Sequence, residues 1–106
     1  MKLASTSAAI ACGMLLGTLA FAAATVTVKQ IDKAFDKASI SIKAGDTVDF
    51  TNADTVAHNI MSRSADPFNL GIMKAGETKS RKFDHAGTFE VVCALHPRMK
   101  LSVEVK

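Results

Sequence analysis

A short segment near the C-terminus carries three side chains that bind soft metal ions. Cys93, His96 and Met99 supply a thiolate, an imidazole and a thioether at intervals of three residues. A second imidazole, that of His58, lies far upstream. Two histidines, one cysteine and a weakly bound methionine form the ligand set of a blue-copper site, where the metal gains and loses single electrons. We therefore predict one type 1 copper ion bound by these four residues, in a protein with no catalytic residues of its own.

Other chemistry is open to the same side chains. Zinc accepts histidine and cysteine, although a thioether is a poor ligand for it. A Cys93 nucleophile with His96 as its base is a second alternative, but the sequence indicates neither an orienting acid nor a substrate pocket. The third alternative is a delivery protein that binds copper as cargo. Each ligand taken alone would more often be a structural or surface residue, so the copper prediction depends on all four together.

Another histidine and two further methionines are assigned ordinary roles. His85 lies in the predicted turn Asp84-His85-Ala86-Gly87, so we expect it at the surface. Met61 and Met73 are expected in the core or at its rim, with Met73 near the end of the ligand segment. A methionine-rich surface for copper delivery is the alternative interpretation of these two side chains.

The first 24 residues have the pattern of a secretory signal peptide. A single lysine is their only charge, and an apolar run extends from Ala8 to Ala24. The run ends in A-x-A patterns, so we predict cleavage near Ala22–Ala24 and a mature domain of residues 25–106. Two alternatives are weaker. The run is short for an uncleaved membrane anchor, and the residues before Cys12 match a lipidation signal poorly.

Export would place the protein in the periplasm, where cysteines normally pair as disulfides. The predicted mature domain keeps only Cys93, and a bound metal ion would explain a lone thiol in an oxidising compartment. The formal net charge of the chain is +3, with the lysines scattered along it. Because nucleic-acid binding requires clustered positive charge, we expect no nucleic-acid partner. We also expect the protein to act as a monomer.

The predicted mature domain reads as a series of strands. Alternation with period two recurs between turns rich in Gly, Asp and Asn, and no helical period is present. The predicted strands are residues 25–31, 39–42, 47–52, 57–61, 78–83, 88–93 and 100–106. Residues 32–38 and 62–70 are predicted to be surface connections, followed by a short apolar piece at 71–73. We predict an all-β fold, a two-sheet antiparallel Greek-key sandwich of about seven strands.

Such a sandwich would position the ligands. Cys93 ends one predicted strand, and an open bend stiffened by Pro97 leads on to Met99. His58 lies at the start of a distant strand, so only the folded sandwich brings it to this bend. Because the strands hold the ligands, little should move when an electron arrives. Asn59 follows His58, and its amide is predicted to hydrogen-bond to the Cys93 loop, unless it is an ordinary polar strand residue.

Five segments of the chain follow a known pattern, in the same order. They are Ala44-Gly45-Asp46-Thr47-Val48, Asn52 with Val56-Ala57-His58-Asn59, Ala75-Gly76-Glu77-Thr78, Gly87-Thr88-Phe89 and Cys93-Ala94-Leu95-His96-Pro97-Arg98-Met99. Residues 35–106 thereby resemble the plastocyanin-like cupredoxins. The last segment looks most like the ligand loop of the amicyanins and of bacterial plastocyanin-like proteins. The sequence departs from the family in having Val91 where Tyr is common, and in lacking Tyr and Trp altogether.

The resemblance implies a cupredoxin fold and a role for each site residue. His58, Cys93 and His96 would be the equatorial copper ligands, Met99 the axial ligand, and Asn59 the residue behind the thiolate. Members of the family carry single electrons between larger redox proteins. The implied partners are a donor dehydrogenase or cytochrome and an acceptor cytochrome or oxidase.

In the family, the ring edge of the loop histidine faces the solvent and passes the electron. Leu95, Pro97 and Met73 would surround His96 with an apolar patch small enough for transient redox docking. Arg98 replaces the aromatic residue of the amicyanins and adds a positive charge at the rim. We therefore expect an acidic partner surface and an association rate that falls as salt rises.

Overall fold

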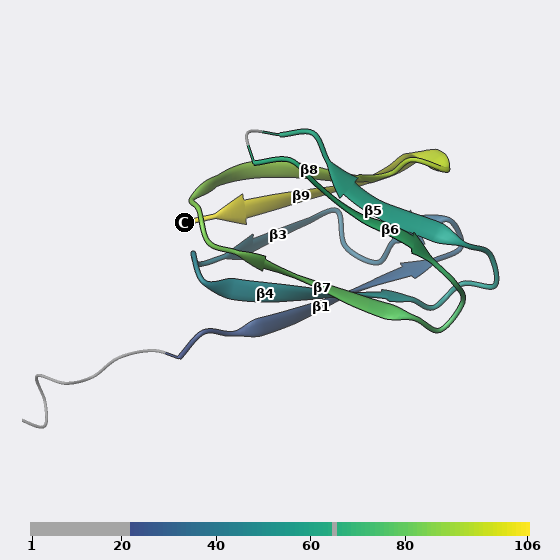
Figure 1. The fold of residues 1–106 in the computed structure, drawn as a ribbon, viewed down its shortest axis with the longest axis horizontal. Helices are drawn as coiled ribbons and strands as arrows, with labels where there is room; N and C mark the ends of the chain where they lie inside the picture. Colours follow the sequence, from purple (N-terminus) through teal and green to yellow (C-terminus); the bar gives the residue numbers. More distant parts are fainter. Residues whose placement is uncertain (1–21, 65) are drawn as a thin grey trace, which may run out of the picture.

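The strands form two sheets that face each other (Figure 1). The computed structural model describes residues 22–64 and 66–106. The strands are β1 (Thr25–Ile31), β2 (Ala34–Phe35), β3 (Ser39–Ile42), β4 (Asp46–Asn52), β5 (His58–Ser62), β6 (Phe68–Met73), β7 (Thr78–Phe83), β8 (Gly87–Cys93) and β9 (His96–Val105). One sheet has the order β2-β1-β4-β7 and the other β3-β9-β8-β5-β6. In this part of the chain no helix is long and apolar enough to cross a membrane.

The predicted all-β sandwich is confirmed, but two details of the prediction are wrong. The described residues form nine strands rather than about seven. The sheets are mixed instead of antiparallel, because β1 runs parallel to β4 and β3 runs parallel to β9. Alternation along a segment indicates a strand, but it carries no information about the direction of the neighbouring strand.

The two additional strands lie in segments predicted to be loops. β2 has only two residues, which are too few to show alternation. β6 includes Phe68 to Leu70, which were assigned to a surface connection, and the apolar piece that follows. It lies at the edge of its sheet, and Pro67 directly precedes it, where a missing N–H removes no hydrogen bond from the ladder.

Side chains from both sheets fill the interior. The buried core consists of Val28, Ile42, Val48, Phe50, Ile60, Met73, Phe83, Phe89, Val91, Leu101, Val103 and Val105. The rings of Phe68, Phe83 and Phe89 pack edge to face in sequence, with centroids 5.8 and 5.3 Å apart. This arrangement brings the positive edge of one ring to the negative face of the next, and such ring pairs stabilise the core.

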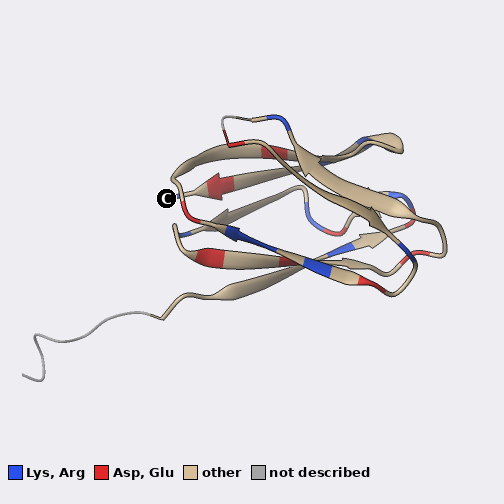
Figure 2. Ribbon diagram, in the orientation of Figure 1, with Lys and Arg blue, Asp and Glu red and all other residues tan. Residues whose placement is uncertain are grey.

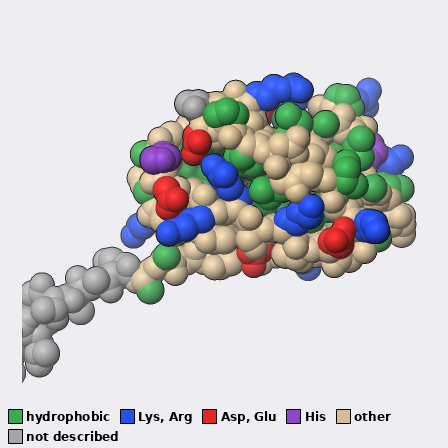
Figure 3. Space-filling view, in the orientation of Figure 1, with side chains coloured by type: hydrophobic (Ala, Val, Ile, Leu, Met, Phe, Trp, Pro, Cys, Tyr) green, Lys and Arg blue, Asp and Glu red, His purple; other side chains and the backbone are tan. Residues whose placement is uncertain are grey.

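Charged residues of both signs are spread over the strands and turns (Figure 2). The face drawn in Figure 3 likewise mixes basic, acidic and hydrophobic side chains. At its right-hand end, hydrophobic side chains gather beside a histidine and a few basic residues. The turn between β8 and β9 lies at that end of the molecule in Figure 1.

The predicted signal peptide, residues 1–24, lies outside the described residues except for Ala22–Ala24, and Cys12 lies outside them as well. Ala24 is bonded to the folded domain. Its N–H donates to Oδ1 of Asp46 at 2.8 Å, and its carbonyl accepts the N–H of Thr47 at 2.9 Å. Ala24 therefore belongs to the folded domain.

Candidate metal centre

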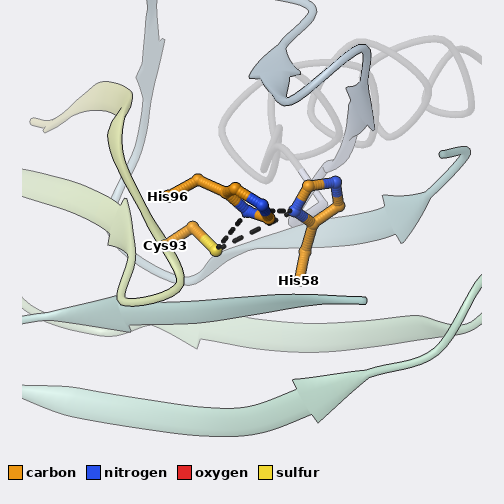
Figure 4. Close-up of side chains that lie close together, drawn as sticks. All are labelled: His58, Cys93 and His96. Atoms are coloured by element: carbon orange, nitrogen blue, oxygen red, sulfur yellow. Dashed lines mark hydrogen bonds between the residues drawn. The ribbon is translucent and has the colours of Figure 1, made fainter. Parts of the chain in front are cut away.

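Three ligand atoms from two distant segments meet at one end of the sandwich (Figure 4). His58 begins β5, Cys93 ends β8 and His96 begins β9. Nδ1 of His58 lies 3.1 Å from Nδ1 of His96 and 3.9 Å from Sγ of Cys93. The remaining edge of the triangle, from His96 Nδ1 to the same sulfur, is 3.7 Å.

A single metal ion fits this triangle. The point equidistant from the three atoms lies about 2.1 Å from each, comparable with the roughly 2.0–2.3 Å of metal bonds to imidazole nitrogen and thiolate in zinc sites. His58 and Cys93 are buried, whereas His96 is half-buried. Two imidazoles and one thiolate in a trigonal arrangement are the equatorial donors of a blue-copper centre.

The register of the β8–β9 hairpin explains why ligands three residues apart converge. Cys93 pairs with His96 across a two-residue turn, whereas the next pair is Val92 with Lys100. Residues 97–99 therefore form a bulge in β9, which bends the strand and redirects its side chains. The predicted open loop, with the last strand beginning at Lys100, is wrong because β9 begins at His96.

Met99 closes this bulge and is buried, with 1% of its surface exposed. The two residues before it, Pro97 and Arg98, are exposed. The bulge thus turns two side chains to the solvent and returns the thioether to the interior, three residues after His96. A thioether is a soft, uncharged donor of the kind that makes a weak axial contact with copper.

Asn59 links the two segments that carry the triangle. Its backbone N–H donates to Sγ of Cys93 at 3.2 Å, and its Oδ1 accepts the N–H of Ala94 at 3.1 Å. Its Nδ2 donates to Oδ1 of Asn69 at 2.9 Å and to the Gly71 carbonyl at 3.2 Å. The predicted hydrogen bond from this amide to the Cys93 loop is therefore present, and it ties β5 and β6 to the hairpin.

A carboxylate that the sequence pattern did not indicate also lies at the site. Oδ2 of Asp54 lies 2.9 Å from Nε2 of His58, the ring nitrogen that faces away from the triangle. The N–H of Lys33, the bond from His58 and the N–H of Thr55 together lower the pKa of Asp54 from 3.8 to about 2. The carboxylate is thus negatively charged at neutral pH. In the sequence, this contact is indicated by nothing more than the position of Asp54 four residues before His58.

Asn52, which the family pattern includes but for which the sequence predicted no role, shapes the turn that leads into His58. Its Nδ2 donates to the carbonyls of Val56 at 2.9 Å and Met73 at 3.0 Å. Its Oδ1 accepts the N–H of Asp54 at 2.9 Å. These bonds satisfy a fully buried amide and fix the backbone on both sides of the turn.

Gln30 supports the site from the opposite sheet. The side chain is fully buried, on the face of β1 that also carries the buried Val28. Its Nε2 donates to the carbonyl of Asn59 at 3.3 Å, while Oε1 has no hydrogen-bond partner among the described residues. The backbone next to His58 is therefore held from both sheets.

A shallow pocket lies at the surface beside His96. It is lined by Lys33, Leu95, His96, Pro97 and Arg98. Leu95 is 49% exposed, so the pocket has an apolar wall with two basic side chains. The predicted contribution of Met73 to this patch is wrong, because Met73 points into the core with none of its surface exposed.

The other assigned residues lie where the sequence placed them. His85 is exposed, and Met61 is half-buried on β5. Met73 is in the core, one of the two positions expected for it.

Fold and site together define a class of protein, a β-sandwich that binds one metal ion through two imidazoles and a thiolate at the end of the sandwich. The sequence profile of the copper binding proteins of the plastocyanin/azurin family matches residues 11–106. The chain belongs to this family, and its cofactor is copper.

Individual relatives agree with the family. Amicyanin-alpha from Methylorubrum extorquens is 31% identical over 106 residues, which cover 96% of this chain and 89% of the relative. A solved structure of an amicyanin variant in the reduced state superposes with a TM-score of 0.72 and 26% identity, over 85% of this chain and 88% of the other. The copper-containing nitrite reductase of Thermus scotoductus gives a TM-score of 0.73 at 25% identity, but the match spans only 24% of that chain.

Proposed function

We propose that this protein is a periplasmic electron carrier whose single type 1 copper ion alternates between Cu(I) and Cu(II). His58, Cys93 and His96 would be the equatorial ligands and Met99 the axial ligand. The observation that carries the proposal is the triangle of ligand atoms, which has the dimensions of a trigonal metal site. The similarity of the chain to amicyanin supports the same function.

The protein would contribute a rigid set of ligands and a route for the electron. His58 and Cys93 are buried and belong to paired strands, so neither has room to follow a change in copper geometry. A copper ion bound here would supply the one-electron chemistry, with ligands acceptable to both oxidation states. His96 is half-buried beside the surface pocket, and its ring offers the path from the site to a docked partner.

The surface around His96 supports docking to larger redox proteins, such as a donor dehydrogenase or cytochrome and an acceptor cytochrome or oxidase. Leu95 and Pro97 supply apolar area, and Lys33 and Arg98 supply positive charge. Two cations beside the electron path favour an acidic partner surface, which would speed encounter at low salt. We expect the protein to act as a monomer.

Export also belongs to the proposal. The sequence of residues 1–24 supports it. In the periplasm the free thiol of Cys93 would be at risk of oxidation without bound metal, so export and the copper site are mutually consistent. The hydrogen bonds between Ala24 and β4 favour cleavage after Ala22 over cleavage after Ala24, because only the first retains them.

The visible and electron paramagnetic resonance (EPR) spectra of the exported protein loaded with Cu(II) test the proposal. A thiolate-to-Cu(II) charge-transfer band of high intensity, with retention of copper through repeated oxidation and reduction, is the expected result. A colourless protein that releases Cu(I) to a competing chelator would instead support copper delivery.

A further inference from the structure

The imidazole of His58 is held at both of its nitrogens. Nδ1 forms one corner of the ligand triangle, and Nε2 lies 2.9 Å from Oδ2 of Asp54. The His58 side chain is fully buried, and that of Asp54 is 12% exposed. A buried ring with fixed partners on both sides has a single orientation available to it.

Asp54 is itself held by backbone groups. Its Oδ2 accepts the N–H of Lys33 at 2.8 Å, and its Oδ1 accepts the N–H of Thr55 at 2.9 Å. Its own N–H donates to the buried side chain of Asn52. Both carboxylate oxygens are therefore oriented by protein groups, and Oδ2 receives the bonds from both Lys33 and His58.

The bond from Lys33 comes from a turn with a strained backbone. Asp32 and Lys33 join β1 to β2, and their φ angles are +54° and +56°. A tight hairpin turn of this kind needs positive φ at both central residues and normally uses glycine or asparagine. Residues other than glycine keep such φ angles only where the surrounding structure enforces them, and such residues concentrate at functional sites. Here the turn directs the amide of Lys33 at the carboxylate of Asp54.

We propose that Asp54 is a positioning residue of the copper centre, which orients His58 and favours Cu(II) over Cu(I). This inference rests on the proposed ligand set. A carboxylate that accepts the second N–H of a ligand histidine fixes the tautomer and makes the ring a stronger donor. A stronger donor and a nearby negative charge both stabilise the ion of higher charge. Asp54 thereby lowers the reduction potential of the site.

Two substitutions separate orientation from charge. In Asp54→Asn, one amide oxygen at the position of Oδ2 keeps the bonds from Lys33 and His58, while the charge and the acceptor for the N–H of Thr55 are lost. In Asp54→Ala, both the charge and the acceptor are lost. We expect Asn to weaken Cu(II) binding about tenfold relative to Cu(I), which corresponds to a rise of about 59 mV in the reduction potential. The alanine variant should show a larger rise.

A spectroscopic measurement reports on orientation independently of the potential. In metal-free protein, the proton on Nε2 of His58 should be protected from exchange, because the ring is buried and the proton is bonded to Asp54. We expect its NMR resonance to shift in Asp54→Asn and to broaden or vanish in Asp54→Ala. The Cu(II) EPR spectrum of the alanine variant should show more than one species.

Asp36→Asn is the matched control. Asp36 also accepts a backbone N–H, that of Lys29 at 3.0 Å, and it lies just after β2 of the same hairpin. The structure gives it no hydrogen bond to the ligand residues, so its loss should leave the potential and the NMR resonance unchanged. A general loosening of the hairpin would affect both proteins equally.

The outcomes are distinguishable. If the wild-type protein lacks the thiolate-to-Cu(II) band, the proposed function is contradicted and this inference with it. If the wild-type protein has the band, but both Asp54 variants keep its potential, its EPR spectrum and its Nε2 proton resonance, the positioning role alone is overturned. A change of equal size in Asp36→Asn would also overturn that role.

Discussion

At each end of the sandwich, an aspartate carboxylate orders a turn by accepting backbone N–H groups. At the end that holds the C-terminus, Asp46 accepts the N–H groups of Ala24 and Lys43 at 2.8 and 2.9 Å. At the metal end, Asp54 accepts two backbone N–H groups in the same way, from Lys33 and Thr55. In both places the carboxylate orders a turn by satisfying donors that the strands leave free.

The difference lies in what each carboxylate touches next. Asp46 follows Gly45, whose φ of +97° costs a glycine little, and its carboxylate holds the backbone at Lys43 and at Ala24. Asp54 also contacts His58, and the amide that holds it comes from a turn with positive φ at Asp32 and Lys33. Backbone strain and a ligand contact occur together at one end only. At the metal end, therefore, the backbone conformation serves the site as well as the stability of the fold.

The largest expected effect at the metal end comes from Cys93→Ser. A hydroxyl is a hard, weak donor to copper, so the intense visible band should disappear and copper affinity should fall by orders of magnitude. Absorption spectra and a competitive copper titration measure both. The melting temperature of the metal-free variant serves as the control for folding. Retention of the band would show that Cys93 is not the thiolate ligand.

Met99→Gln tests the axial position with a smaller change. An amide oxygen favours Cu(II) more than a thioether does, so the protein should keep copper while its reduction potential falls. Voltammetry of the purified protein measures the shift. Met61→Gln makes the same change at a half-buried position of β5 and should leave the reduction potential unchanged. A rise in potential for Met99→Gln would exclude Met99 as the axial ligand.

Asp46→Asn probes the other end of the comparison. The N–H groups of Ala24 and Lys43 lower the pKa of Asp46 below its ordinary value of 3.8. Its contribution to stability is therefore present above pH 3.8 and is lost as the pH falls through the lower pKa of the folded state. The asparagine variant should melt a few degrees below wild type at neutral pH, with the difference shrinking below pH 3.8.

The reduction potential gives the contrasting result for the same variant. Asp46→Asn should leave it at the wild-type value, because Asp46 lies at the far end from the ligands. An equal shift for Asp46→Asn and Asp54→Asn would remove the distinction between the two ends.

The smallest effect is expected from Arg98→Glu at the surface. Oxidation of the Cu(I) protein by the ferricyanide anion should slow by a few-fold at low salt and approach the wild-type rate as salt rises. Stopped-flow kinetics over a salt series measures this. Lys82→Glu changes the same charge on β7, opposite Thr47 near the other end, and should change the rate less. Equal effects would show that net charge, rather than the surface beside His96, controls association.

Much of the fold was predictable because alternation is a local property. The segments around Val28, Phe50 and Val103 are strands in the structure, and these three side chains are fully buried. β6 was not predicted as a whole, because an edge strand beside Pro67 has a weak pattern. The direction of β3 relative to β9 was also beyond reach, since it depends on how the chain crosses between the sheets.

The candidate ligands could be found by residue type and spacing, but their support could not. His58, Cys93, His96 and Met99 are uncommon residues in a familiar combination, so composition and order were enough to propose them. Asp54 is one of many aspartates, and its importance appears only where the ring of His58 turns Nε2 toward it.

The sequence by itself therefore determined most of the strand pattern, the candidate donors and the choice of copper, because each follows from the chemistry of individual residues and their short-range order. Only the tertiary structure decided that a bulge returns Met99 to the interior, that Met73 is hidden while Leu95 is exposed, and that Asp54 contacts the ring of His58. Each of these depends on the packing of segments far apart in the chain, and contacts between such segments leave no periodic trace in the sequence.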